Sequence, residues 1–178
     1  FLATQKAEGF GHTPHVPLWR AMLAPLVGQP VRALEVGSYE GRSAHWLLSN
    51  VLTHPDASIT CIDTFENRER ERRFFANASG AHALAGPSSE WLPRLFVAHG
   101  PGSYDFIYID GSHDAHDVLL DATLALELVR VGGLLAFDDY EWGGGDGPKR
   151  AVDALFACNT DRLEVLHVGA QAWFRRAR

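Results

Sequence analysis

Apolar and polar residues change along the first half of the chain with periods that predict strands and helices in turn. Short apolar runs predict strands at residues 31–36, 58–63 and 83–85. Apolar residues at helical spacing predict helices at residues 16–27, 43–52 and 67–78. The expected order is therefore helix and strand in strict alternation.

The second half continues this alternation and closes on a different pattern. Successive apolar residues predict two central strands, covered on both faces, at residues 104–110 and 134–138. Helices are expected at residues 116–131, ended by Gly132 and Gly133, and at residues 150–158, with Pro148 as the first helical position. Two last strands, 163–168 and 172–175, have only three residues between them, so we expect an antiparallel hairpin.

Strands that alternate with helices predict a doubly wound α/β fold with seven strands, mostly parallel, to which the C-terminal hairpin adds its antiparallel pairing. The chain has 178 residues, of which 46% are hydrophobic and 21% charged, enough for one buried core. We expect a single domain in which residues 1–30 form an N-terminal helical or lid segment and residues 31–178 form the sheet. Such sheets bind ligands beyond the carboxyl ends of their strands.

Composition limits the location and the partners of the protein. No run approaches the 18 apolar residues of a membrane span, and the first residues lack the pattern of a secretory signal. Cys61 and Cys158 match no metal-ligand spacing and are expected to be reduced thiols. The formal net charge of −6 disfavours a surface that follows nucleic-acid phosphates. We therefore expect a cytoplasmic protein with no membrane partner and no nucleic-acid partner.

A glycine turn follows the first strand, with the sequence Glu35-Val36-Gly37-Ser38-Tyr39-Glu40-Gly41. Its glycines would let the backbone pass close to a ligand, and the next helix would point its N-terminus there. The turn is not the G-x-G-x-x-G dinucleotide motif, because Glu35 stands in place of the first glycine. A carboxylate there would repel a pyrophosphate but would hold an ammonium group or, through water, an amino-acid group.

Asp63 ends the second strand at roughly the distance from the glycine turn at which an acid accepts hydrogen bonds from ribose hydroxyls. It would alternatively cap the segment that follows. Ser88 is expected near an adenine, with helix capping as an equally good interpretation. These positions together predict a nucleoside-containing ligand.

Two further strands end in acids, at Asp110 and at Asp138 and Asp139. Neighbouring carboxylates repel, and a divalent cation stabilises them in their charged form. Oxygen ligands favour Mg²⁺ or a similar hard ion, although these acids would alternatively cap helices or bind water. His113 follows closely enough to act as a general base. His116 is a weaker candidate, and His12 and His15 are candidates for a lid.

These motifs together resemble class I S-adenosylmethionine (SAM)-dependent methyltransferases, which have a Rossmann-like sheet. The segments Ile109-Asp110-Gly111-Ser112-His113, Gly132-Gly133 and Phe137-Asp138-Asp139-Tyr140 resemble, more narrowly, metal-dependent O-methyltransferases that modify macrolide and aminocoumarin sugars. The resemblance implies that residues 31–178 bind SAM. It implies cofactor contacts at Glu35, Gly37, Ser38, Tyr39, Gly41, Ser43, Asp63, Thr64, Ser88 and Asp110. It also implies that Asp110, Asp138 and Asp139 hold Mg²⁺ and that His113 and Asp110 take part in catalysis.

The resemblance predicts Mg²⁺-assisted methylation of a hydroxyl on a small molecule. We expect Tyr140, Trp142 and the loop through Gly145 to cover the acceptor, with exposed aromatic residues on a mobile connection as an equally good interpretation. The chain departs from the family pattern at Pro87, where an acid is usual, and we expect no additional substrate-binding domain. A homo-oligomer that completes the acceptor pocket is an open alternative. The alternative functions are an NAD-dependent oxidoreductase, which Glu35 disfavours, a non-catalytic SAM-binding protein, and an RNA methyltransferase, which the acidic charge disfavours.

Overall fold

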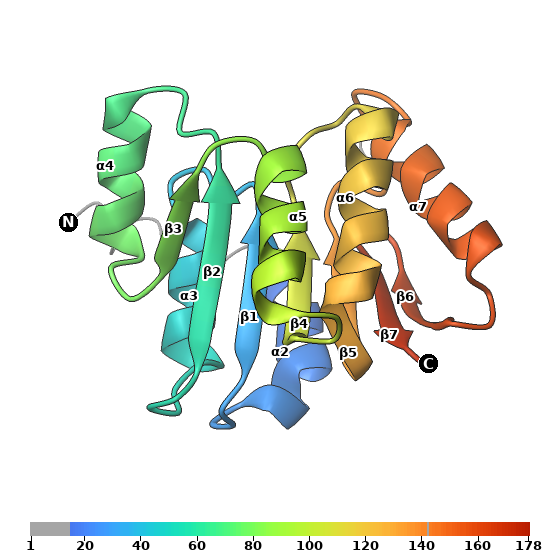
Figure 1. The fold of residues 1–178 in the computed structure, drawn as a ribbon, viewed down its shortest axis with the longest axis horizontal. Helices are drawn as coiled ribbons and strands as arrows, with labels where there is room; N and C mark the ends of the chain where they lie inside the picture. The colour runs from blue at the N-terminus through green and yellow to red at the C-terminus, as the bar shows by residue number, and fades with distance from the viewer. Residues whose placement is uncertain (1–14, 142) are drawn as a thin grey trace.

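The computed structural model describes residues 15–141 and 143–178 (Figure 1). The helices are α2 (His15–Leu23), the 3₁₀ helix η1 (Ala24–Leu26), α3 (Arg42–Asn50), α4 (Arg68–Asn77), α5 (Ser88–His99), α6 (Ala115–Leu128) and α7 (Gly147–Cys158). The strands are β1 (Arg32–Val36), β2 (Ser58–Asp63), β3 (His82–Ala85), β4 (Tyr104–Ile109), β5 (Val129–Phe137), β6 (Leu163–Val168) and β7 (Ala172–Arg176). No helix in these residues is both long enough and apolar enough to cross a lipid bilayer.

All seven strands form one sheet in the order β3-β2-β1-β4-β5-β7-β6. The pairs from β3 to β5 are parallel, and β7 runs antiparallel to both β5 and β6. This confirms the predicted doubly wound sheet with its antiparallel C-terminal hairpin. Because the strand order reverses between β1 and β4, the carboxyl ends of these two strands border the crevice where such sheets bind ligands.

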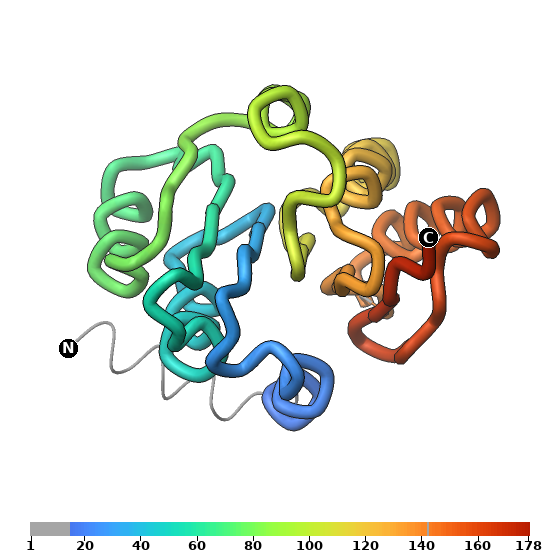
Figure 2. The backbone as a smooth tube through the Cα atoms, turned by 60° about the horizontal axis from the view of Figure 1, so that its bottom comes forward, coloured from blue at the N-terminus to red at the C-terminus, as the bar shows by residue number. Residues whose placement is uncertain are grey.

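Helices cover both faces of the sheet, and each face has its own buried cluster. Trp19 of α2, Trp46 of α3 and Phe74 of α4 belong to one cluster. Helices α5, α6 and α7 contribute residues such as Leu92 and Leu155 to the other. Figure 2 shows α2 and α5 on opposite sides of the sheet. The central strands are therefore buried on both faces, as their continuous apolar runs predicted.

Helix α2 is part of the core of the domain. Its apolar residues Val16, Trp19 and Leu23 lie at helical spacing and are buried. The Trp19 side chain is fully buried, and its ring meets those of Trp46, Tyr108 and Trp173 edge to face. The predicted lid role of residues 1–30 concerns His15, which begins α2, and His12, which lies outside the described residues.

The boundary between α6 and β5 differs from the prediction. Helix α6 ends at Leu128, and Gly132 and Gly133 lie inside β5 and do not end the helix. Gly132 has a φ of 79°, and the pairing of β4 with β5 shifts register nearby. A Cβ on Gly133 would lie 2.9 Å from the Asp105 carbonyl oxygen. These glycines permit an irregularity in the strand, a role that glycine also has in β-bulges. Helix α7 begins at Gly147, so Pro148 is its second residue.

Candidate active site

The glycine turn after β1 packs directly on the end of β4. Gly37 has a φ of 86°, and a Cβ on it would lie 2.0 Å from the Asp110 carbonyl oxygen. Gly41 has a φ of 77°, and its Cβ would meet the side chains of Phe74 and Ala78. Both glycines are thus required by contacts within the protein, whereas the sequence had suggested a close approach to a ligand. The consequence is that the β1 turn and Asp110 form one rigid unit.

Glu35 lies beneath this unit, and its side chain is completely buried. The Ser43 hydroxyl donates a short hydrogen bond to Glu35, and the Cys61 thiol donates to it across 3.4 Å. Burial raises the pKa of Glu35, although the hydrogen bond from Ser43 opposes this shift. Glu35 lines neither of the two cavities described below, so it orients Ser43 and the glycine turn.

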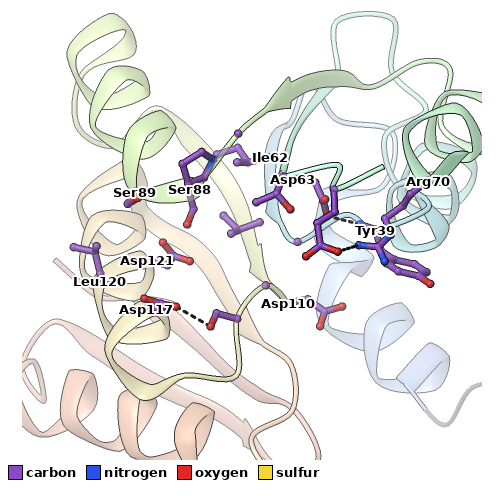
Figure 3. A pocket seen from close by; sticks show the side chains of 18 residues that line it. Tyr39, Ile62, Asp63, Arg70, Ser88, Ser89, Asp110, Asp117, Leu120 and Asp121 are labelled. Carbon is purple, nitrogen blue, oxygen red and sulfur yellow. Dashed lines mark hydrogen bonds and ion pairs between the residues drawn. The ribbon is translucent and has the colours of Figure 1, made fainter. Parts of the chain in front are cut away.

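A first cavity of about 480 Å³ lies between β1, β2 and the N-terminal ends of α5 and α6 (Figure 3). Asp63 lines it and accepts backbone N–H bonds from Tyr39 at 2.7 Å and from Phe65 at 2.8 Å. Asp63 therefore closes a local turn, but helix α4 is capped by Asn67. A carboxylate offers about four acceptor sites, so Asp63 keeps capacity for ligand hydroxyls. Thr64 lines the same cavity.

The opposite wall of the first cavity contains an acid that sequence reasoning missed. Ser88 lines this wall as the first residue of α5, so it is not the helix cap. Asp121 of α6 is 3% exposed, and burial raises its pKa to about 6, while a hydrogen bond from Ser88 opposes the shift. Figure 3 shows the Ser88 and Asp121 side chains facing each other on this wall of the cavity. The sequence had predicted a helix here but had not singled out Asp121.

A second cavity of about 630 Å³ adjoins the first, and Gly37, Tyr39, Asp110 and Gly111 line both. Its other lining residues include Ser38, Ser43, His15, Arg42, Tyr108, His113, Asp138, Asp139 and Gln171. Gly37 and Asp110 therefore form the junction of the two cavities, and a ligand that occupies both cavities must lie over these two residues. Most of the predicted site residues line one or both cavities.

Asp110 and Asp138 meet around the buried hydroxyl of Tyr108. The Tyr108 oxygen lies 2.6 Å from Asp138 Oδ2 and 3.2 Å from Asp110 Oδ2. Burial raises the pKa of Asp110 well above its usual range, and repulsion from Asp138 adds to this shift. In the described part of the chain, no ion pair joins either acid to a lysine or arginine. A cation between Asp110 and Asp138 would stabilise their charged forms.

Asp139 is held by His113 of the loop after β4. His113 Nε2 lies 2.7 Å from Asp139 Oδ2, and Asp139 has a φ of 56°. Within residues 15–141 and 143–178, the carboxylates of Asp110, Asp138 and Asp139 do not approach as a trio within 4.8 Å. The residues that do are Asp114, His116 and Asp117, all exposed, and Asp114 there caps helix α6. Binding of one cation by the predicted trio therefore requires these carboxylates to move closer together.

The predicted acceptor cover is different in the structure. The Tyr140 hydroxyl donates to Asp153 of α7 at 2.7 Å and accepts from Lys149 at 3.0 Å. Tyr140 lines neither cavity, so its predicted role as a cover is wrong. Gly145 also lines neither cavity, and Trp142 lies outside the described residues.

Tyr108 and Gln171 are the main site residues that the sequence did not identify. The side chain of Gln171 lies in the turn between β6 and β7 and donates to Asp138 Oδ1 at 3.1 Å. Tyr108 is two positions before Asp110 and therefore on the same face of β4, a signal that could have found it. No sequence signal indicated Gln171, because its place depends on where the hairpin packs.

A family model described as a methyltransferase domain matches residues 34–140 of the chain. This match includes the end of β1, the glycine turn, Asp63, Asp110 and the two acids after β5. The chain therefore belongs to this family of methyltransferase domains, which confirms the resemblance that the motifs indicated.

Particular relatives agree with this family. Caffeoyl-CoA O-methyltransferase 1 of Zea mays is 32% identical over 140 residues, which cover 72% of this chain and 52% of the relative. The chain spans about half the length of the curated relatives it matches.

Solved structures share the fold at lower identity. The MycE methyltransferase from the mycinamycin biosynthetic pathway, in complex with Mg, SAH and mycinamycin VI, has a TM-score of 0.71 and 20% identity, covering 92% of this chain and 50% of that one. The O-methyltransferase TomG from Streptomyces achromogenes, in complex with SAM, has a TM-score of 0.71 and 18% identity, covering 99% and 90%. Both have the same doubly wound architecture.

Proposed function

We propose that this chain transfers the methyl group of SAM to a hydroxyl oxygen of a small molecule, with the assistance of Mg²⁺. The observation that carries the proposal is the pair of cavities that meet at Gly37 and Asp110. One offers the carboxylate of Asp63, suited to a nucleoside, and the other gathers the three strand-end acids together with His113. The family membership and the relatives named above support the same chemistry.

The first cavity would hold the adenosine part of SAM. Asp63 would accept hydrogen bonds from the ribose hydroxyls, with Thr64 and Ser88 farther along the cavity. The methionine part would pass Gly37 into the second cavity, toward Ser38 and Ser43 at the beginning of α3. Tyr39 would border the passage, since it lines both cavities.

Asp110, Asp138 and Asp139 fit a hard cation, because they offer only oxygen donors and because burial makes the charge of Asp110 costly. Bound there, Mg²⁺ would lower the pKa of an acceptor hydroxyl and orient it. The three carboxylates would be the protein ligands, and the position of the cation among them would define where the acceptor lies relative to the methyl group.

His113 would remove the proton from the acceptor hydroxyl. The acceptor oxygen then forms a bond to the methyl carbon while the bond from that carbon to the sulfur breaks, which leaves S-adenosylhomocysteine (SAH). The proton stays on the His113 imidazole until solvent takes it. Asp139 lies 2.7 Å from His113 and would orient the imidazole before it turns to the cation. Alignment of the acceptor oxygen, the methyl carbon and the sulfur would supply the rest of the rate enhancement.

The acceptor would be a small polar molecule, since the described lining of the second cavity consists of charged, polar, glycine and tyrosine residues. His15, which begins α2, lines this cavity and would form part of a lid over it. A cytoplasmic location agrees with the free thiols of Cys61 and Cys158. A homo-oligomer would complete the acceptor pocket from a second copy.

Ligand-dependent stabilisation tests this function. Because a ligand that binds the folded state raises the melting temperature, SAM and SAH should each raise it, and Mg²⁺ should raise it further. Stabilisation by NAD in place of SAM would instead support an oxidoreductase. SAM binding without any effect of Mg²⁺ would support a non-catalytic SAM-binding protein.

A substitution then separates Mg²⁺-assisted methyl transfer from SAM binding. Asp139→Ala should abolish Mg²⁺-stimulated methyl transfer and leave the Kd for SAM nearly unchanged, as measured by calorimetry. Asp56→Ala is a matched control that should change neither quantity, because Asp56 is an exposed acid that lines neither cavity. An equal loss of turnover and of SAM affinity in Asp139→Ala would contradict the assignment of metal binding and SAM binding to different residues.

A further inference from the structure

We propose that Gln171 is a positioning residue whose side-chain amide holds Asp138 in the orientation for cation binding and connects it to the N-terminal helix α2. This inference rests on the proposed function, because it concerns the same acidic site. It adds Gln171, Trp19 and Trp173 to the residues on which that site depends. None of these three side chains was expected to act there.

The orientation of the Gln171 amide is determined by its neighbours. Its Oε1 lies 2.8 Å from Trp19 Nε1 and 3.1 Å from Trp173 Nε1. An indole N–H is a donor only, so the atom of Gln171 that faces both indoles must be the oxygen. The amide nitrogen consequently faces the opposite way, toward Asp138 and Tyr108. A flipped amide would set N–H against N–H at two buried positions.

Asp138 is in turn held by donors on both of its oxygens. Asp138 Oδ1 accepts from Gln171 Nε2 at 3.1 Å and from the Asp139 backbone N–H at 3.0 Å. Its Oδ2 accepts from the Tyr108 hydroxyl at 2.6 Å. Three donors leave the carboxylate one favourable orientation, with the remaining acceptor sites available to a cation. Residues that orient a metal ligand in this way strongly affect metal affinity.

The chain of contacts reaches into the core of the domain. Gln171 is 1% exposed, and Trp19 and Trp173 are fully buried. The Trp19 ring lies 4.9 Å from the Tyr108 ring and 6.0 Å from the Trp173 ring, with both pairs edge to face. Helix α2 therefore supports the two residues that hold Asp138, although α2 lies outside the matched methyltransferase segment, residues 34–140.

Calorimetry on two variants tests the inference. Gln171→Met keeps the length of the side chain and removes its hydrogen bonds, so the Kd for Mg²⁺ in the presence of SAH should rise about tenfold. The Kd for SAH, measured without metal, should stay within about twofold, because Gln171 does not line the first cavity and its amide nitrogen bonds Asp138 and not Ser38 or Ser43, toward which the amino-acid part of the cofactor extends. Trp19→Phe removes one indole donor and should raise the Mg²⁺ Kd by a smaller factor. It also provides a second measurement should Gln171→Met fold poorly.

Val152→Ala is the matched control, since Val152 is 1% exposed in the other core cluster. It should lower the melting temperature without changing the Mg²⁺ Kd. Unchanged Mg²⁺ affinity in both test variants, or an equal rise in the Kd for SAH, would overturn the positioning role. A wild-type chain that binds SAH but no Mg²⁺ would overturn the proposed metal role itself, so the two failures are distinguishable.

Discussion

The two cavities differ in how the protein holds the carboxylate at the centre of each. In the first cavity, Asp63 is held by backbone N–H groups of Tyr39 and Phe65, and Phe65 is only two residues away. In the second cavity, the side chains of Tyr108 and Gln171 hold Asp138, and both are more than 25 positions distant in the chain. Backbone donors persist through most substitutions, whereas side-chain donors do not. The nucleoside cavity should therefore tolerate mutation of its surroundings better than the acidic cavity.

A substitution at the junction between the cavities should have the largest effect. Gly37→Ala would place a Cβ 2.0 Å from the Asp110 carbonyl oxygen at a φ of 86°. Overpacking and backbone strain together should cost about 3–5 kcal/mol of unfolding free energy. Thermal denaturation should show this loss, and calorimetry should show that SAH and Mg²⁺ binding fall together. Gly80→Ala is the control, because its Cβ would make only ordinary contacts with Leu48. Loss of one ligand alone would show that the cavities are independent.

A pH series tests the buried acid in the nucleoside cavity. The pKa of Asp121 is raised from its ordinary 3.8 to about 6, mainly by burial, so the folded protein binds this proton more tightly than the unfolded chain does. The group therefore favours folding most below about pH 4, and this contribution is lost as the pH rises through about 6. Asp121→Asn should gain stability relative to wild type over that range, by up to about 3 kcal/mol.

Chemical denaturation at pH 4, 5, 6 and 7 measures the difference between Asp121→Asn and wild type. Asp117→Asn, an exposed acid one turn earlier on α6, is the matched control and should show no such gain. A constant difference across the series would mean that Asp121 carries no burial penalty.

The smallest expected effect concerns Asp63 itself. In Asp63→Asn the side chain keeps one acceptor oxygen, but its amide nitrogen would face a backbone N–H or a ribose hydroxyl. The Kd for SAH should rise about tenfold, or about 1.4 kcal/mol, while the Kd for Mg²⁺ stays within about twofold. A rise in both constants would show that the nucleoside carboxylate also supports the acidic site.

Much of the fold and part of the site could be predicted from the sequence. The mostly parallel sheet, the C-terminal hairpin and the positions of Asp63, Asp110, Asp138 and Asp139 at strand ends follow from periodicity and from the rule that parallel strands end on one edge. The end of α6 was placed wrongly, because paired glycines resemble a helix stop although here they form an irregularity within β5. The role of Tyr140 was also wrong, since α7 holds its hydroxyl.

By itself the sequence determined which residue types stand at the strand ends, and therefore the class of chemistry, because those patterns are local and repeat with the period of each element. Only the tertiary structure decided how the acids are held. Glu35 is buried and bonded to Ser43, Asp139 is paired with His113, and Gln171 donates a hydrogen bond to Asp138. These contacts join side chains far apart in the chain and depend on packing of whole elements, about which no local pattern carries information.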